Sequence, residues 1–272
     1  MDTVLAVVIA VPVAFFLGVL GTLFLGGDHK VVLDIAVAAV GSFGGAIAGG
    51  YAAFALEERR RQRERRDRQI AAANTALVTL TSMWNALYGY ESNVVRPAIA
   101  DESMPEPLWL RLRTTVGYRP QLTFNMDELV FLLRTSDSMA LMDLTMQEQR
   151  YQDINNALEV RDRLLAEALE RMETHGLGRD GLPTHEQIAQ AVGPFTVSRL
   201  RTTTKVLITN LYRTMKDMSE FHGRFQRVLR TEFGEQDVRT FELNDFTSEI
   251  KPANLDGWVS RAMAKCEFKW SE

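Results

Sequence analysis

The stretch that decides the fold runs from Val31 to Gln69 and has the sequence VVLDIAVAAVGSFGGAIAGGYAAFALEERRRQRERRDRQ. Up to Leu56 it contains one ionisable residue, Asp34, and the 22 residues from Ile35 onward are uncharged. A helix of that length extends about 33 Å at ~1.5 Å per residue, enough to cross the ~30 Å hydrocarbon core of a bilayer. No proline separates it from the charged part. The pattern predicts a membrane span, residues 31–56, that continues as a charged helix.

The charged part, residues 57–69, is rich in arginine. It contains Arg59, Arg60, Arg61, Arg63, Arg65, Arg66 and Arg68. This excess of basic residues is typical of the cytoplasmic side of a membrane. Opposite charges four residues apart indicate that the helix continues through the segment. The arginines either contact anionic lipid headgroups or only fix the topology and face solvent, and both alternatives make this a cytoplasmic juxtamembrane helix.

A second uncharged segment, residues 4–25, precedes the first and contains Pro12. A cleaved signal peptide fits poorly, because there is no basic start and the segment exceeds the usual ~7–15 apolar residues. The link of residues 26–30 is too short for a domain. We therefore expect a transmembrane hairpin over residues 1–56, with both termini in the cytoplasm.

Small residues line one side of the second span. Gly41, Gly45 and Gly49 recur every four residues, a spacing that lets another helix backbone approach closely. The partner is either the first span of the same chain or the second span of another copy. The length of the stripe favours a contribution from self-association, and hence a homo-oligomer.

Asp34 is the only ionisable residue within the apolar stretch, and an acidic residue in a span suggests a pore or transport pathway. It also lies four residues after Lys30, near the start of the helix. There it has structural alternatives, which are an ion pair with Lys30 or a favourable interaction with the helix N-terminus.

Charge and composition limit the partners. After Arg68 there are 23 basic and 28 acidic residues, so the larger part of the chain is acidic. This argues against nucleic-acid binding, which needs a basic surface, and leaves the bilayer as the partner of the arginines. The single cysteine, Cys266, cannot form an intrachain disulfide, in agreement with a reducing compartment. Twenty-five Arg against six Lys favours a bacterial plasma membrane.

Residues 70–272 have the pattern of a cytoplasmic helical bundle. A first amphipathic helix has apolar residues at Ala73, Leu77, Leu80, Trp84 and Leu87 and is expected to stop at Arg96-Pro97. A helix from about residue 138 to 175 has apolar residues at steps of seven, namely Leu144, Tyr151, Leu158, Leu165 and Met172. A later helix of similar length has two such rows, interrupted by Thr204 and Thr214. The pattern predicts an antiparallel pair of long helices, against which the first helix packs.

Shorter elements connect these helices. Residues 97–120 form an irregular hinge or lid, and residues 127–134 form a short helix. Residues 136–138 are expected to cap the first long helix, and Thr184 begins a capping box. Residues 238–243 are expected to form either an edge strand or an extended segment packed on the bundle.

Motifs of chemistry are weak in this chain. The glycines at 176, 178 and 181 match G-x-G-x-x-G, but they follow a long helix rather than a strand, so we interpret the segment as a helix stop. His185-Glu186 begins H-E-x-x-H, but position 189 is alanine. We expect no enzyme, no metal and no cofactor.

In layout, over about its first 90 residues, the chain resembles the two-span membrane effectors of bacterial defence systems that carry a helical tail. The resemblance implies an oligomeric, effector or channel-like membrane protein, in which the bundle controls the assembly or opening of the small-residue spans. The alternative is a membrane-tethered scaffold or regulator that recruits a cytosolic protein.

Overall fold

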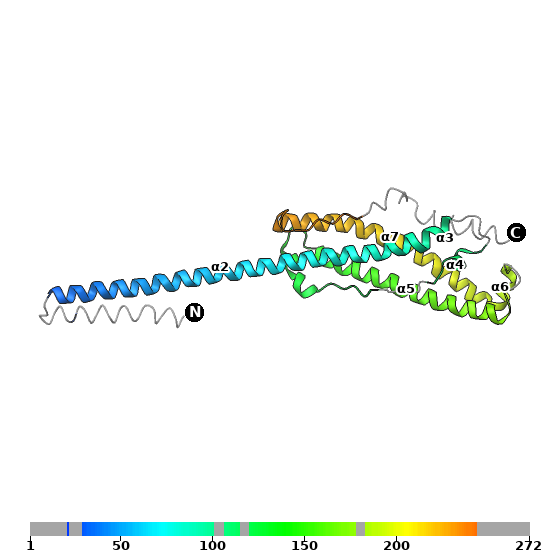
Figure 1. Ribbon diagram of the computed structural model, residues 1–272, viewed down its shortest axis with the longest axis horizontal. Coiled ribbons are helices and arrows are strands. Elements are labelled where there is room, and N and C mark those ends of the chain that lie inside the picture. Colours follow the sequence, from blue (N-terminus) through cyan, green and yellow to red (C-terminus); the bar gives the residue numbers. More distant parts are fainter. Residues whose placement is uncertain (1–20, 22–28, 101–105, 115–119, 178–182, 244–272) are drawn as a thin grey trace. The chain divides into compact units, whose positions relative to one another are not determined.

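The computed structural model describes residues 21, 29–100, 106–114, 120–177 and 183–243 (Figure 1). Within these residues the regular structure is helical and no strand occurs, which confirms the all-α prediction. The chain divides into two compact units, residues 1–67 and 68–272. Helix α2 (His29–Tyr90) contributes to both.

The first unit contains the predicted transmembrane hairpin. Apart from residue 21, the predicted first span lies outside the described residues. The predicted second span and the arginine-rich segment both belong to α2, in agreement with a helix that continues through them. Across the residues that the structure describes, no helix combines the length and apolar character that crossing a membrane requires. The membrane hairpin stays a prediction from the sequence.

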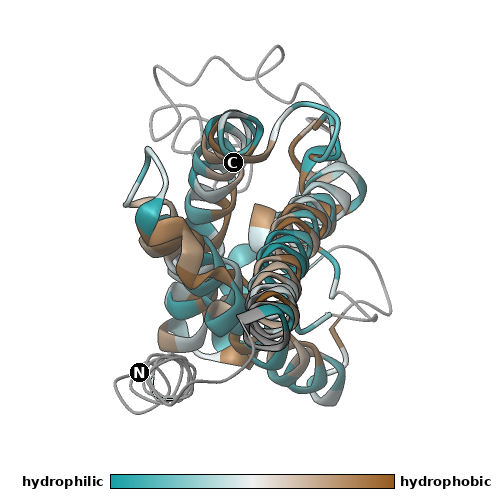
Figure 2. Cartoon of the chain, turned by 90° about the vertical axis from the view of Figure 1, so that its left-hand side faces the viewer, coloured by the Kyte–Doolittle hydropathy of each residue, from teal (hydrophilic) through white to brown (hydrophobic). Residues whose placement is uncertain are grey.

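The second unit is built on three long helices, which lie side by side in Figure 1. They are the C-terminal part of α2, α5 (Ala140–Thr174) and α7 (Pro194–Phe233). Helix α5 has 35 residues and α7 has 40, which agrees with the lengths expected from their heptad patterns. Each long helix carries both hydrophilic and hydrophobic residues around its circumference (Figure 2), as expected for amphipathic helices that share a core.

Polar contacts between the helices define their directions. Thr81 of α2 contacts His222, and Glu91, the residue directly after α2, contacts Tyr212, so ten residues forward from Thr81 correspond to ten residues backward along α7. Asp143 pairs with Arg224, and Arg150 pairs with Asp217 at 2.5 Å. Helix α7 therefore runs antiparallel to both α2 and α5.

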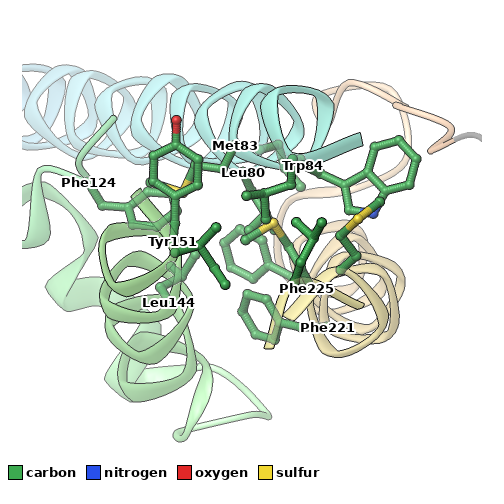
Figure 3. Close-up of a cluster of buried hydrophobic side chains, with 14 of the residues drawn as sticks. Leu80, Met83, Trp84, Phe124, Leu144, Tyr151, Phe221 and Phe225 are labelled. Carbon is green, nitrogen blue, oxygen red and sulfur yellow. The ribbon is translucent and has the colours of Figure 1, made fainter. Parts of the chain in front are cut away.

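Side chains from all three helices meet in the core (Figure 3). Leu80, Met83 and Trp84 of α2 are turned toward Leu144 and Tyr151 of α5 and toward Phe221 and Phe225 of α7. Every residue that the sequence placed on an apolar row of the bundle is buried, including the two threonines of α7. Burial of these rows at ~25 cal/mol per Å² of apolar surface is what holds the helices together.

The ends of α5 follow local rules of capping. At its C-terminus Gly176 has φ +70°, and the Leu177 and Gly176 amides donate to the carbonyls of Met172 and Glu173, a Schellman motif. The G-x-G-x-x-G segment therefore begins as a helix stop. At the N-terminus the cap is Met139, and residues 136–138 precede the helix in a turn in which the Asp137 carboxylate accepts from the Met139 amide.

Short helices complete the unit. They are η1 (Glu91–Val95), α3 (Arg96–Ala100), α4 (Leu108–Arg111), η2 (Met126–Arg134) and α6 (His185–Val192). The expected short helix near residue 130 forms as the 3-10 helix η2. Thr184 makes the expected capping box with Gln187 at the start of α6. In α4, Leu108 and Trp109 are buried, so the described part of the expected hinge or lid is packed into the bundle.

The described residues that follow α7, 234–243, contain no strand. Residues 235–237 form a turn and the chain bends at Val238. Residues 238–243 then pack on the bundle without regular structure, which is closer to the second of the two expectations. The Asn74 side chain bonds the carbonyl of Asp237 at 3.0 Å and the amide of Arg239 at 2.9 Å. The aromatic residues after position 243 lie outside the described residues.

Because Leu80 is fully buried at the centre of the three helices, we expect Leu80→Ala to lower the free energy of unfolding by about 2–5 kcal/mol. Val78, which lies two residues away and is exposed, provides the control, and Val78→Ala should change stability by less than ~0.5 kcal/mol. Denaturant unfolding of the full-length chain measures both. Equal effects of the two substitutions would contradict the arrangement of the core.

Candidate functional site

The site residues proposed from the sequence all lie on the first part of α2. Asp34 and the glycines Gly41, Gly45 and Gly49 are exposed. Among the described residues, nothing lies within 4 Å of the place a Cβ would take at these three glycines. Large apolar side chains on the same part of the helix are also exposed, by 65–75% at Val37, Tyr51, Phe54 and Leu56.

The seven arginines of residues 59–68 are exposed on α2 as well. Arg61 pairs with Glu57 at 3.0 Å and Arg60 pairs with Glu64 at 2.9 Å, so two of the expected pairs four residues apart are present. Exposed pairs of this kind contribute little to stability, typically ~0–1 kcal/mol. Their effect is to keep the segment helical while its cations face outward.

The second part of α2 ends in a way that sequence reasoning did not anticipate. The helix does not stop at Arg96-Pro97 but widens into the π-helical turn η1, in which the Arg96 amide donates to the Glu91 carbonyl five residues earlier. A proline in a regular α-helix removes an amide donor and collides with the carbonyl four residues before it. Widening the turn directly before Pro97 lets the chain pass into α3, with the Asn93 side chain donating to the Gly89 carbonyl at 2.8 Å.

The wider turn creates a buried charge cluster. It brings Arg96 back over Glu91, and the guanidinium donates to both carboxylate oxygens, Nε to Oε1 at 3.1 Å and Nη2 to Oε2 at 2.9 Å. The Tyr212 hydroxyl of α7 donates to Oε1 at 3.1 Å. The Glu91 side chain is 0% exposed, whereas that of Arg96 is 39% exposed. Burial and the nearby Glu91 carboxylate raise the pKa of Tyr212 well above its usual range, so this hydroxyl stays protonated and remains a donor.

A second buried cation lies at Arg161 of α5, whose side chain is 0% exposed. Its guanidinium donates to the backbone carbonyls of Trp109, Leu112 and Arg113 and to the Asp162 carboxylate, at 2.9 Å for the last. Carbonyls near the C-terminus of a short helix carry partial negative charge, which favours a cation there. Arg161 therefore ties α4 to α5.

Arg161 also marks a division in the core. The buried residues of α5 that precede Arg161, up to Leu158, belong to a large apolar cluster shared with α2. Those that follow it, from Leu164, belong to a smaller cluster shared with α6. On α7 the same division falls at Thr204, which is buried between Leu200 of the small cluster and Leu207 of the large one. The threonine that interrupts the sequence pattern thus lies where the two apolar clusters meet on α7.

His222 of α7 is the third buried polar group. The Thr81 hydroxyl donates its only proton to the Leu77 carbonyl at 2.8 Å, so in the 3.3 Å contact with His222 the Nε2–H group of the imidazole is the donor. Burial lowers the pKa of His222 to about 4. The neutral imidazole therefore joins α7 to α2 at ordinary pH.

In the part of the chain that the structure describes, no group of three or more His, Cys, Asp or Glu side chains is arranged to hold a metal ion. The three buried polar sites instead contain guanidinium, carboxylate, hydroxyl and imidazole groups that bond to one another or to backbone carbonyls. Their arrangement positions helices. Sequence reasoning missed them because each joins residues that are distant along the chain or five apart in a turn that is not α-helical.

Comparison of the chain with known proteins gave no match among protein-family models, curated proteins or solved structures. The resemblance in layout to bacterial defence effectors stays a prediction.

Removing Arg96 should be more harmful than removing the whole pair. Arg96→Met leaves a fully buried carboxylate with Tyr212 as its remaining described partner, and we expect a loss of about 3 kcal/mol in the free energy of unfolding. Glu91→Gln combined with Arg96→Met leaves no buried charge unpaired and should recover at least half of that loss. Denaturant unfolding of the single and double variants tests this. A double variant that is less stable than the single one would refute the buried-charge interpretation.

His222 should make the bundle sensitive to acid. Its folded pKa of about 4 lies below the unfolded value of 6.5. Between these values the unfolded chain takes up a proton that the folded chain does not, so stability falls as pH falls through this window, by at most ~1.4 kcal/mol per pH unit. Unfolding at pH 7, 5.5 and 4.5 should show a shallower decline for His222→Gln than for the unaltered chain. Parallel declines would exclude His222 as a source of the pH dependence.

Proposed function

We propose that this chain is an oligomeric integral membrane protein of the effector or channel-like class. In this proposal the bundle is cytoplasmic and controls the association of the glycine-rich part of α2 within the plasma membrane of a bacterium. One observation carries the proposal. Helix α2 is a single helix from His29 to Tyr90, with exposed apolar and glycine residues in its first part and buried core residues in its last part.

The exposed side chains of Val37, Tyr51 and Phe54 support this environment. Leaving several large apolar side chains of one helix in water is unfavourable by about 1.5–3 kcal/mol each relative to burial. A lipid or protein environment removes that penalty. The following exposed arginines suit the anionic headgroups of a cytoplasmic leaflet, where each contributes about 1 kcal/mol.

The open glycine face supports association of helices. Between helices in lipid there is no hydrophobic driving force, so close backbone approach at small residues and weak Cα–H contacts supply the attraction. Gly41, Gly45 and Gly49 provide such a surface, and the described residues leave it uncovered. In an assembly, Asp34 of each copy would be brought near the others, which is the arrangement a pore requires.

Coupling follows from the helix itself. A flexible linker between spans and bundle would let each move independently. In this proposal α2 acts as a continuous helix in place of such a linker, so that a change in the packing of the bundle around it would be passed toward the glycine face as rotation or tilt. The rival role, a tethered scaffold, needs only an anchor and makes no demand on the glycine face.

The decisive substitution is Gly45→Leu, which places a bulky side chain on the small-residue face. We expect it to abolish association, seen as a loss of mass of the nanodisc-extracted complex, and to abolish conductance or toxicity in cells. Gly44→Leu is the matched control, because a step of one residue turns it by about 100° toward the side of Val37 and Tyr51. Asp34→Ala should reduce conductance while leaving the mass unchanged. An anchor would tolerate all three substitutions, and a monomeric extracted chain would exclude the proposal.

A further inference from the structure

Helix α5 carries a row of residues on the side that faces away from the core. The row repeats at alternating steps of three and four residues, the spacing that keeps side chains on one side of a helix in a coiled coil. Its members are exposed and include both apolar and acidic residues, namely Met142, Met146, Asp153, Val160, Glu167 and Glu170. We call it the outer row of α5. Of the large apolar side chains exposed on α5, Leu169 alone lies outside it.

Helix α7 carries an outer row with the same spacing. Its exposed members include Phe195, Arg199, Val206 and Arg213, and Phe195 and Val206 are the large apolar side chains that α7 exposes. The Arg199 guanidinium lies over the Phe195 ring, 5.8 Å from its centre. Residues 194–216 contain five basic and no acidic residues. The outer row of α7 is therefore a basic surface that includes apolar side chains.

The apolar residues of the two outer rows match in level along the bundle. Arg150 of α5 pairs with Asp217 of α7, and the helices are antiparallel, so residues equally far forward from Arg150 and backward from Asp217 lie at one level. Val160 is ten residues after Arg150, and Val206 is eleven residues before Asp217. The two valines therefore lie at the same level to within about 1.5 Å, the rise of one residue.

Opposite charges match in level in the same way. Glu167 lies at the level of Arg199, and Asp153 lies at the level of Arg213, each to within one residue. Both rows face away from the shared core, so these residues are held apart within one chain. In the described part of the chain Glu167 takes part in no ion pair. A second copy at the same level would bring each acidic residue its basic counterpart.

We propose that the outer row of α5 in one copy packs against the outer row of α7 in a neighbouring copy, so that the bundles associate side by side. The inference rests on the proposed function and deepens it, because copies held in one membrane and related by an axis perpendicular to it stay at the same level. Val160 then meets Val206, and Glu167 meets Arg199. The contact joins different surfaces of the two copies, and contacts of this kind form a ring when the rotation closes.

The size of the contact explains why it would need the membrane. One row of one helix from each copy is a narrow surface, and interfaces well below ~1,200 Å² belong to weak and transient complexes. Copies confined to the same bilayer have a raised effective concentration, so a weak contact between bundles becomes populated. The charges act mainly on the choice of partner surface and on register. This gives the bundle a direct means of controlling assembly.

Cysteine crosslinking tests the contact in the full-length chain embedded in membranes. Cys266→Ser first removes the native thiol. Val160→Cys and Val206→Cys together should then give dimers or larger species with a short bismaleimide, and each alone should give none. The matched control replaces Val206→Cys with Lys205→Cys, which keeps the level but turns the thiol by about 100° around the helix. The control should crosslink severalfold less.

Charge reversal tests which side chains meet. In the crosslinking chain, Glu167→Arg places two arginines opposite each other and should lower the crosslinked fraction severalfold, because like charges across an interface disfavour it. Adding Arg199→Glu should restore the crosslinked fraction. Lys205→Glu makes the same change of charge outside the outer row and should not restore it. All these positions are exposed, so the circular dichroism should remain that of the unaltered chain.

The possible failures are distinguishable. Absence of crosslinks between positions 160 and 206, in a chain whose extracted complex keeps its oligomeric mass, would overturn this contact and leave the proposed function standing. Equal restoration by Arg199→Glu and Lys205→Glu would also overturn it. A monomeric extracted chain would instead exclude the proposed function, and this contact with it.

Discussion

The bundle depends on the enclosure of one uncharged helical segment. From Gln69 to Tyr90, α2 contains no charged residue, and its three leucines, Trp84 and three of its five alanines are buried. A helix that is apolar on so many sides is stable in water only when other elements surround it. Helices α5 and α7 pack against it in one core, and residues 237–239 bond to Asn74 on its surface. The lengths of the two long helices and the turn at Gly234 serve this enclosure.

Apolar contact alone does not fix how these helices are aligned, because hydrophobic burial has no direction. Alignment comes from polar groups placed inside the core. Thr81 of α2 contacts His222, and ten residues further, at the first residue of η1, Glu91 contacts Tyr212, so one register satisfies both contacts. A displaced register would leave a buried carboxylate and a buried imidazole without these partners, at a cost of about 1–3 kcal/mol for each group. Arg161 of α5 likewise bonds the backbone carbonyls of Trp109 and Leu112, which holds α4 against α5.

The sequence was sufficient for the parts of the fold that repeat. Apolar steps of seven residues predicted α5 and α7 and their buried faces, because burial imposes that period directly. It was not sufficient where backbone atoms act as partners. The partners of the Arg161 guanidinium are mostly backbone carbonyls some 50 residues earlier in the chain. The partners of the Asn74 side chain are the Asp237 carbonyl and the Arg239 amide, at separations of 163 and 165 residues. Every residue has such groups, so no residue pattern reveals them.

The π-helical turn that begins at Glu91 explains why the helix does not stop at Arg96-Pro97, as the proline predicted. Pro97 does exclude a regular α-helix, but the rule assumes that the chain must then leave the helix. Widening by one residue instead lets the helical chain continue directly into α3, and it also brings Arg96 over Glu91. The same wider turn therefore accommodates Pro97 and forms the ion pair between Glu91 and Arg96. The turn that relieves a backbone conflict thus supplies the charge pair that fixes α2 against α7 at the end of the helix.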